Sequence, residues 1–306
     1  RMASCELSDQ WIQAIFSMLV CGFDRMLDFN ATLVSWITSV EAIGHTFVRY
    51  VLPFTWDYSE AAPLSDVRGG YKMCVDAVTV ALETASSTTN TIAPMPKVRH
   101  RSALEMHEEG DYDLIITDPP YYDAISYADI MDYFYVWLRR NLSSFSPEFA
   151  DVFSLPLSPK WSPEVGDGEL IDNPTLFSGD REASKNSYEE GMAKAFARCR
   201  DALTHEGRLV IVFANKSPNA WETLISSIIR AGFVVDGSWP IQTEQAARMR
   251  AQSSAALASS VWIVCRKRSA ASRPGWDTSV LDEMHENIIQ KLRDFWDEGL
   301  RGPDFV

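Results

Sequence analysis

The amino-acid sequence predicts an α/β fold in which a helical segment precedes a domain of alternating strands and helices. Up to residue 90, apolar residues recur mainly at helical spacing. From Lys97 onward, short β-branched apolar runs alternate with amphipathic segments. Repeated strand–helix units build a mostly parallel sheet covered by helices. The last strand, 260–265, is expected to be antiparallel because no helix of sufficient length separates it from the strand before.

The N-terminal segment is expected to be helical over residues 8–52, from the apolar spacing that starts at Trp11 and Ile15 and returns at Ile43 and Phe47. A second helix is predicted over 70–82, followed by a polar linker over 85–96. These patterns divide the chain into a helical segment (1–90), an α/β domain (96–268) and a C-terminal helix within 269–306.

In the α/β domain, the expected strands are 98–102, 114–117, 208–213, 233–236 and 260–265. A helix is predicted over 127–140, and a long polar segment over 143–184 is expected to be a functional loop. The next helix carries an apolar face and ends at 205–207; that face comprises Met192, Phe196, Cys199 and Leu203. Ser217-Pro218 starts another helix, closed by Gly232, and a last helix covers 279–296.

Composition excludes several classes of protein. The five cysteines form no Cys-x-x-Cys pair, so neither a metal site nor a disulfide framework is indicated. No apolar run approaches the ~18 residues that a membrane span needs, and no leader pattern is present, so we expect a cytoplasmic protein without a membrane partner. The net charge of −14 argues against a nucleic-acid binder unless basic residues gather locally. Candidate clusters are 99–101, 139–140, 248–250 and 266–268.

The run Leu114–Tyr121 (LIITDPPY) is the most informative motif. A buried strand that ends in Asp-Pro-Pro-Tyr sets a carboxylate and an aromatic ring at the carboxyl end of a sheet, where α/β folds bind ligands. The two prolines offer no N–H donors and leave carbonyls free to accept hydrogen bonds. Such a corner suits a planar base with an amino group; a tight surface turn is the alternative.

Three stretches resemble the long adenine-specific DNA methylases that carry an N-terminal domain of unknown function, some with a zinc ribbon. They are Asp113–Arg140, Val212–Glu222 and Ser238–Arg266, with Phe47–Glu60 matching more loosely. The resemblance implies a Rossmann-like class I methyltransferase sheet and S-adenosyl-L-methionine as cofactor. It also implies double-stranded DNA with a flipped adenine as substrate, and a role in restriction-modification or phage defence.

The chain departs from that family in lacking its zinc ribbon and its Gly-rich cofactor loop. Gly69-Gly70 and Gly166–Gly168 do not follow a predicted strand. We therefore expect a partner chain or a missing N-terminal segment to supply the loop, with this chain as the catalytic part.

The resemblance assigns roles to the motif. Asp118 and the Pro119 carbonyl accept the hydrogens of the adenine amine, and Asp118 also contacts the cofactor. Pro120 completes the turn, and Tyr121 stacks on the flipped base. Ser102, after the strand before the motif strand, has the position from which related enzymes contact the cofactor's adenosine.

Five further residues are candidates for substrate binding. Tyr122 is expected to line the base pocket or to lie in a surface turn, and Asn215 and Lys216 to contact the base or a phosphate, or to satisfy loop backbone. Trp239 would wall the pocket or belong to the core, and Arg250 would contact phosphate or lie on a solvated helix.

Other functions stay open. The chain can be a non-catalytic nucleic-acid-binding or scaffolding fragment that keeps the corner without holding the cofactor. The same chemistry also suits amino groups of cytosine, RNA or a protein side chain.

Overall fold

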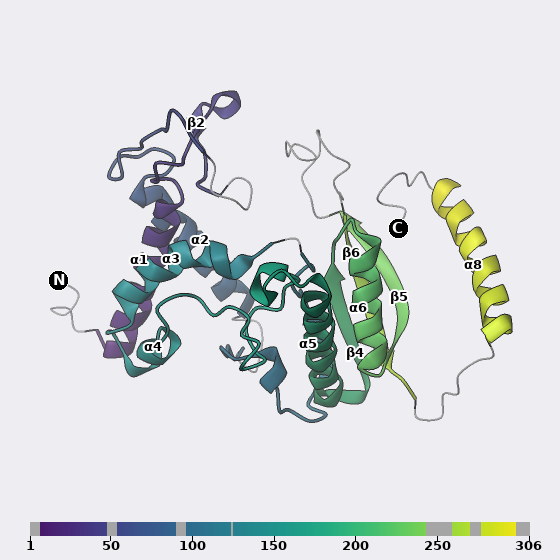
Figure 1. Ribbon diagram of the computed structural model, residues 1–306. Helices are drawn as coiled ribbons and strands as arrows, with labels where there is room; N and C mark the ends of the chain where they lie inside the picture. The colour runs from purple at the N-terminus through teal and green to yellow at the C-terminus, as the bar shows by residue number, and fades with distance from the viewer. Residues whose placement is uncertain are drawn as a thin grey trace. The chain divides into compact units, whose positions relative to one another are not determined.

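The computed structural model describes residues 7–47, 54–89, 96–123, 125–242, 259–269 and 277–297 (Figure 1). The chain divides into two compact units, one formed by residues 1–100 and 126–160 and the other by 101–125 and 161–306. Residues 126–160 therefore belong with the N-terminal part, whereas the sequence placed them within the α/β domain.

The first unit is mainly helical, with a small antiparallel hairpin. Its elements are α1 (Asp9–Leu27), β1 (Trp36–Ile37), the 3-10 turn η2 (Thr38–Val40), β2 (Ala42–Ile43), α2 (Tyr71–Thr89), α3 (Tyr127–Leu142) and α4 (Pro147–Val152). The helical structure expected over residues 8–52 is confirmed for α1 and is wrong from residue 28 to residue 47, where turns and the hairpin form. Glu41 adopts a left-handed conformation with φ of 47°, and the amide of Gly44 donates to the Ser35 carbonyl at 2.9 Å, so the chain turns back as a hairpin. Residues 48–51 lie outside the described part.

The predicted linker over 85–96 is helical as far as Thr89. Hydroxyl groups along the end of α2 donate to carbonyls three or four residues earlier, and so fold back onto the helix instead of breaking it. These residues are Thr84, Ser87, Thr88 and Thr89.

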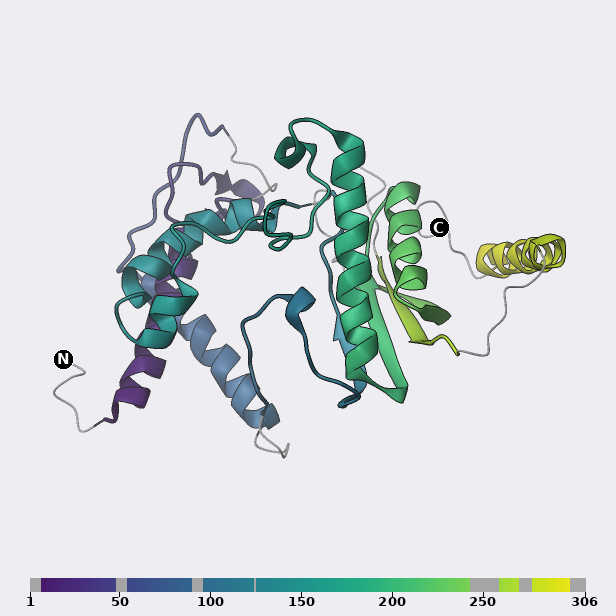
Figure 2. The ribbon, with the colours of Figure 1, turned by 60° about the horizontal axis from the view of Figure 1, so that its bottom comes forward.

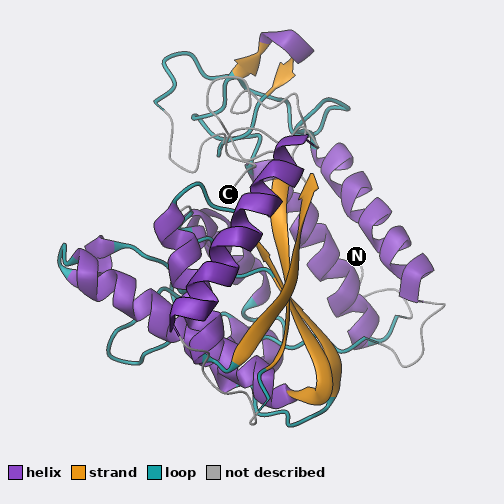
Figure 3. Ribbon diagram, turned by 90° about the vertical axis from the view of Figure 1, so that its right-hand side faces the viewer, coloured by secondary structure: helices purple, strands orange, loops and turns teal. Residues whose placement is uncertain are grey.

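The second unit contains a four-stranded mixed sheet. Its strands β3 (Tyr112–Thr117), β4 (Leu203–Phe213), β5 (Phe233–Gln242) and β6 (Ser259–Lys267) lie in the order β3-β4-β6-β5, and Figure 3 shows their twist. β3 and β4 are parallel, whereas β6 is antiparallel to both β4 and β5. The antiparallel last strand is thus confirmed. β3, β4 and β5 share one direction, but only one of the three pairings is parallel because β6 lies between β4 and β5.

No strand forms over 98–102. Residues 96–102 belong to no strand, and Ser102 caps the 3-10 helix η3 (Ala103–Glu105) by accepting a hydrogen bond from the Leu104 amide at 3.1 Å. A polar cap competes with strand pairing for the same backbone.

Helices α5 (Arg181–Ala202) and α6 (Pro218–Arg230) lie side by side on one face of the sheet (Figure 2). α5 ends at Ala202, so residues 205–207 belong to β4 and do not end the helix. α6 begins at Pro218 after the cap residue Ser217, as predicted. Gly232 follows it with φ of 85°.

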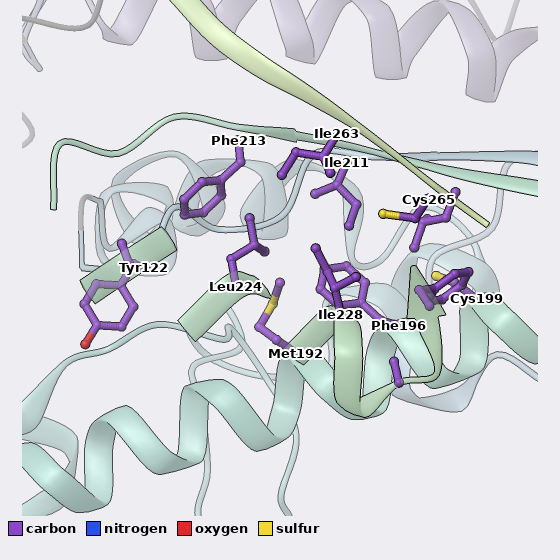
Figure 4. Packing of buried hydrophobic residues seen from close by; sticks show 14 of the residues in the cluster. Tyr122, Met192, Phe196, Cys199, Ile211, Phe213, Leu224, Ile228, Ile263 and Cys265 are labelled. Carbon is purple, nitrogen blue, oxygen red and sulfur yellow. The ribbon is translucent and has the colours of Figure 1, made fainter. Parts of the chain in front are cut away.

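The main core of this unit lies between the two helices and the sheet. Figure 4 shows Tyr122 at one end of the cluster and Cys199 and Cys265 toward the other. The remaining described elements of the unit are η4 (Pro174–Phe177) and α8 (Asp277–Asp297). Among the described residues, no helix has the length and apolar character needed to cross a membrane.

Candidate functional site

The Asp-Pro-Pro-Tyr turn leaves the sheet directly after β3, which is the edge strand of the described sheet. Asp118 is exposed, so its carboxylate does not point into the protein interior. The Tyr121 hydroxyl donates to Asp118 Oδ1 at 2.7 Å. This hydrogen bond fixes the carboxylate and the aromatic ring relative to each other.

The carbonyls after Pro119 are all engaged. The Pro120 carbonyl accepts from the Tyr188 hydroxyl at 2.7 Å and from the Tyr122 amide at 3.0 Å. The Tyr121 carbonyl accepts from Asn215 Nδ2 at 2.9 Å, and the Tyr122 carbonyl accepts from the Asp172 amide at 3.2 Å.

The Pro119 carbonyl is different. Within the described ranges, no donor of the protein bonds to its oxygen. It therefore lies beside the exposed Asp118 carboxylate as a second acceptor that the fold leaves available.

The buried side chain of Tyr122 anchors the turn to the core. Its side chain is only 8% exposed and packs edge-to-face against Tyr188, with ring centroids 5.3 Å apart. Its φ of 63° is uncommon for a residue other than glycine. Burial first, and then a hydrogen bond with Asp172, raise the pKa of the Tyr122 phenol. A buried ring cannot line a base pocket, so the substrate-contact role expected for Tyr122 is replaced by a supporting one.

Asn215 links the turn to the end of β4. While its Nδ2 donates to the Tyr121 carbonyl, its Oδ1 accepts from the Ser217 amide at 2.8 Å. Its own carbonyl accepts from Trp221 Nε1 at 2.8 Å. The side chain thus satisfies loop backbone, which was the alternative to base contact. The neighbouring Lys216 is exposed at the same strand end.

Tyr121 packs against aromatic side chains of the core. Phe213, the last residue of β4, lies edge-to-face with Tyr121 at 5.4 Å and with Trp221 at 5.0 Å. Tyr121 is half-buried against this row. The side chains that hold the site but that sequence reasoning missed are Tyr188, Asp172, Phe213 and Trp221. Tyr188 could have been found, because it precedes Met192 and Phe196 at four-residue spacing on the predicted apolar face of α5.

Two other candidates lie elsewhere in the second unit. Ser102 does not follow a strand: its hydroxyl donates to Asp167 Oδ1 at 2.6 Å while it caps η3. Trp239 does not follow a strand either, because β5 continues to Gln242; it is paired with Trp262 across the sheet and is 55% exposed. Arg250 lies outside the described residues, as do Arg248 and Gln252.

Two arginines of the predicted basic clusters are paired with carboxylates. Arg101 pairs with Glu108, and Arg266 pairs with Asp236 at 2.6 Å. Arg139 donates to the Phe153 carbonyl, and Arg140 lies over the Trp137 ring. A nucleic-acid surface therefore does not follow from these arginines alone.

No protein-family model matches the chain, and no curated protein matches it.

Proposed function

We propose that this chain carries the catalytic corner of an S-adenosyl-L-methionine-dependent DNA methyltransferase that modifies the exocyclic amine of a flipped adenine. The observation that carries the proposal is the pair of acceptors at the end of β3. Asp118 is exposed and the Pro119 carbonyl has no donor within the described structure, while the three carbonyls that follow are each held in place.

The chemistry needs two acceptors of this kind. The amine of adenine is a weak nucleophile because its lone pair is delocalised into the ring. If Asp118 and the Pro119 carbonyl accept the two amine hydrogens, the lone pair is localised and aimed away from them. Bound S-adenosyl-L-methionine would supply an electrophilic methyl group. Asp118 is then placed to take the proton that the methylated nitrogen must lose.

Tyr121 supports base capture. Its ring stands beside the acceptor pair, tied to Asp118 through its hydroxyl and backed by Phe213. Stacking of a flipped base on such a ring contributes about 1–3 kcal/mol by alanine substitution. Because Phe213 already holds the Tyr121 ring in place, the ring can bind a base without an ordering step.

The strand directions support the proposed fold. Three strands run in one direction, β6 runs against them, and the motif is at the carboxyl end of β3. Ligands of open α/β sheets bind at that end. This arrangement is consistent with a Rossmann-like methyltransferase sheet, and the Gly-rich cofactor loop would come from a partner chain or another segment.

The test is labelled methyl transfer to DNA, followed by detection of the modified base. We expect Asp118→Asn and Asp118→Ala to lose turnover, while Asp123→Asn, an exposed acid in the same loop, retains it. A fully active Asp118→Ala protein would refute the assignment. Calorimetry with S-adenosyl-L-methionine distinguishes an autonomous enzyme from a scaffolding fragment, since the latter binds none.

The net charge of −14 favours a second candidate, methylation of an amide or amine on a protein. The same acceptor pair suits any planar amino group, including that of cytosine. Offering the labelled methyl donor with DNA, RNA and protein separately decides among these substrates.

A further inference from the structure

The two faces of the β3-β4-β6-β5 sheet are in different environments. All sheet residues of the main core lie on the face that α5 and α6 cover. They include Ile115, Leu209, Ile211, Ile263 and Cys265, and the four of these on β4 and β6 are at most 3% exposed.

The opposite face, called here the open face, is apolar and is exposed along the two edge strands β3 and β5, while Val210 and Ser260 on its central strands are 8% and 5% exposed. The strand register shows which residues lie on this face. Ile116, Val210 and Val264 are neighbours there, as are Val212, Trp262 and Trp239. Leu114 is 53% exposed, Ile116 56%, Trp239 55% and Ile241 41%. Contiguous apolar surface of this kind marks an interaction site.

Helix α8 has an unpartnered apolar stripe of its own. Met284, Ile288 and Leu292 recur at four-residue spacing, and each is between 38% and 50% exposed. Every α8 residue whose side chain is described is exposed. An amphipathic helix usually forms because its apolar side is buried, so a partner for this stripe is expected.

We propose that the apolar stripe of α8 packs on the open face of the sheet. The connection supports this occupant: β6 ends at Lys267 and α8 begins at Asp277, so the tether is short and reaches at most ~30 Å. The tether makes the contact intramolecular, with an effective concentration in the millimolar range.

Lengths and register also match. If α8 runs back along the sheet from the end of β6, Ile288 lies ~16 Å along the helix. Trp262, five residues before Lys267, lies ~16 Å along the strand. Ile288 would then meet the Trp262 and Trp239 pair on the open face.

Charge is complementary at the end where α8 starts. Arg208 and Arg266 are register partners on the open face and share the single carboxylate of Asp236. The first half of α8 carries Asp282, Glu283 and Glu286, whereas its basic residues Lys291 and Arg293 come later.

Hydrogen exchange of the full chain, read by mass spectrometry, tests the proposal. A docked α8 should exchange at least ~100-fold more slowly than an unstructured chain, whereas a solvated helix of this length stays within ~10-fold. Trp239→Asp should remove the protection of α8 peptides. Ser238→Asp, an exposed neighbour on the other face of β5, should not.

A second pair of substitutions changes α8 instead of the sheet. Ile288→Asp should remove protection from α8 and increase exchange in β5 and β6, whereas Gln290→Asp, on the polar side, should leave both unchanged. Two results overturn the proposal. One is an unprotected α8 in the unsubstituted protein. The other is protection that Trp239→Asp and Ser238→Asp affect equally, which would mean that α8 packs elsewhere and that another segment or a second copy covers the open face.

Discussion

Tyr188→Phe should loosen the turn that carries the proposed catalytic residues. The substitution removes one oxygen atom and keeps the ring, so packing against Tyr122 is preserved. What is lost is the hydrogen bond that the hydroxyl donates to the Pro120 carbonyl at 2.7 Å. The Tyr122 amide also loses its 3.3 Å contact with the hydroxyl, although it keeps the Pro120 carbonyl as acceptor.

The magnitude follows from burial. Tyr188 is 1% exposed, so water cannot replace the missing donor without entering the core. The Pro120 carbonyl keeps the Tyr122 amide as a donor, so the substitution removes one hydrogen bond and leaves no acceptor unsatisfied. We therefore expect the free energy of unfolding to fall by about 0.5–1.5 kcal/mol, measured by urea denaturation followed by circular dichroism. Hydrogen exchange at the Tyr122 amide should accelerate because its surroundings open more often.

Tyr135→Phe is the matched control. Tyr135 is 5% exposed, and its hydroxyl donates to the Leu155 carbonyl at 3.0 Å in the first unit. It should lose a similar amount of stability without changing exchange at Tyr122. If Tyr188→Phe leaves both the stability and the Tyr122 exchange rate unchanged, the turn is not held by this hydroxyl and the reasoning fails.

Two more substitutions test the roles of Asn215 and Asp24. Asn215→Ala removes the donor to the Tyr121 carbonyl and the acceptor of the Ser217 amide, so thermal unfolding should show a loss of about 1–2 kcal/mol; an unchanged midpoint would contradict the linking role. Burial raises the pKa of Asp24 to about 7, well above the ordinary carboxyl value. The folded state therefore holds a proton that the unfolded chain releases, and this contribution is complete at acidic pH and lost as pH rises through 7. Asp24→Asn, which stays neutral, should stabilise the protein by about 1–3 kcal/mol more at pH 8 than at pH 5; equal effects at both pH values would show that Asp24 is not buried uncharged.

Sequence reasoning located the elements whose cause is local. The strand before Asp118 is rich in β-branched residues, and α6 starts at a Ser-Pro pair that is typical of a helix N-terminus. The antiparallel placement of β6 also followed from the chain alone, since the sequence shows no helix of sufficient length between it and the strand before.

Elements that depend on distant partners were harder to predict. Residues 98–102 have a strand-like composition but find no neighbouring strand, and Ser102 is satisfied by Asp167, which lies 65 residues later. Because Tyr122 directly follows the motif, the sequence suggested that its side chain lines the base pocket. Its positive φ turns the side chain inward against Tyr188, and single-residue patterns do not show such a reversal.

The two prolines of the motif explain why the turn needs the whole unit. Pro119 and Pro120 have no N–H groups, so the turn lacks two of the donors with which short loops usually stabilise themselves. Beside the Tyr122 amide, the donors come from three separate places: Tyr188 on α5, Asn215 after β4, and the Asp172 amide before η4. A turn held by three elements cannot move as a flexible loop does. The available carbonyl of Pro119 is therefore kept in a fixed position relative to Asp118, and this is the preorganisation that amine activation requires.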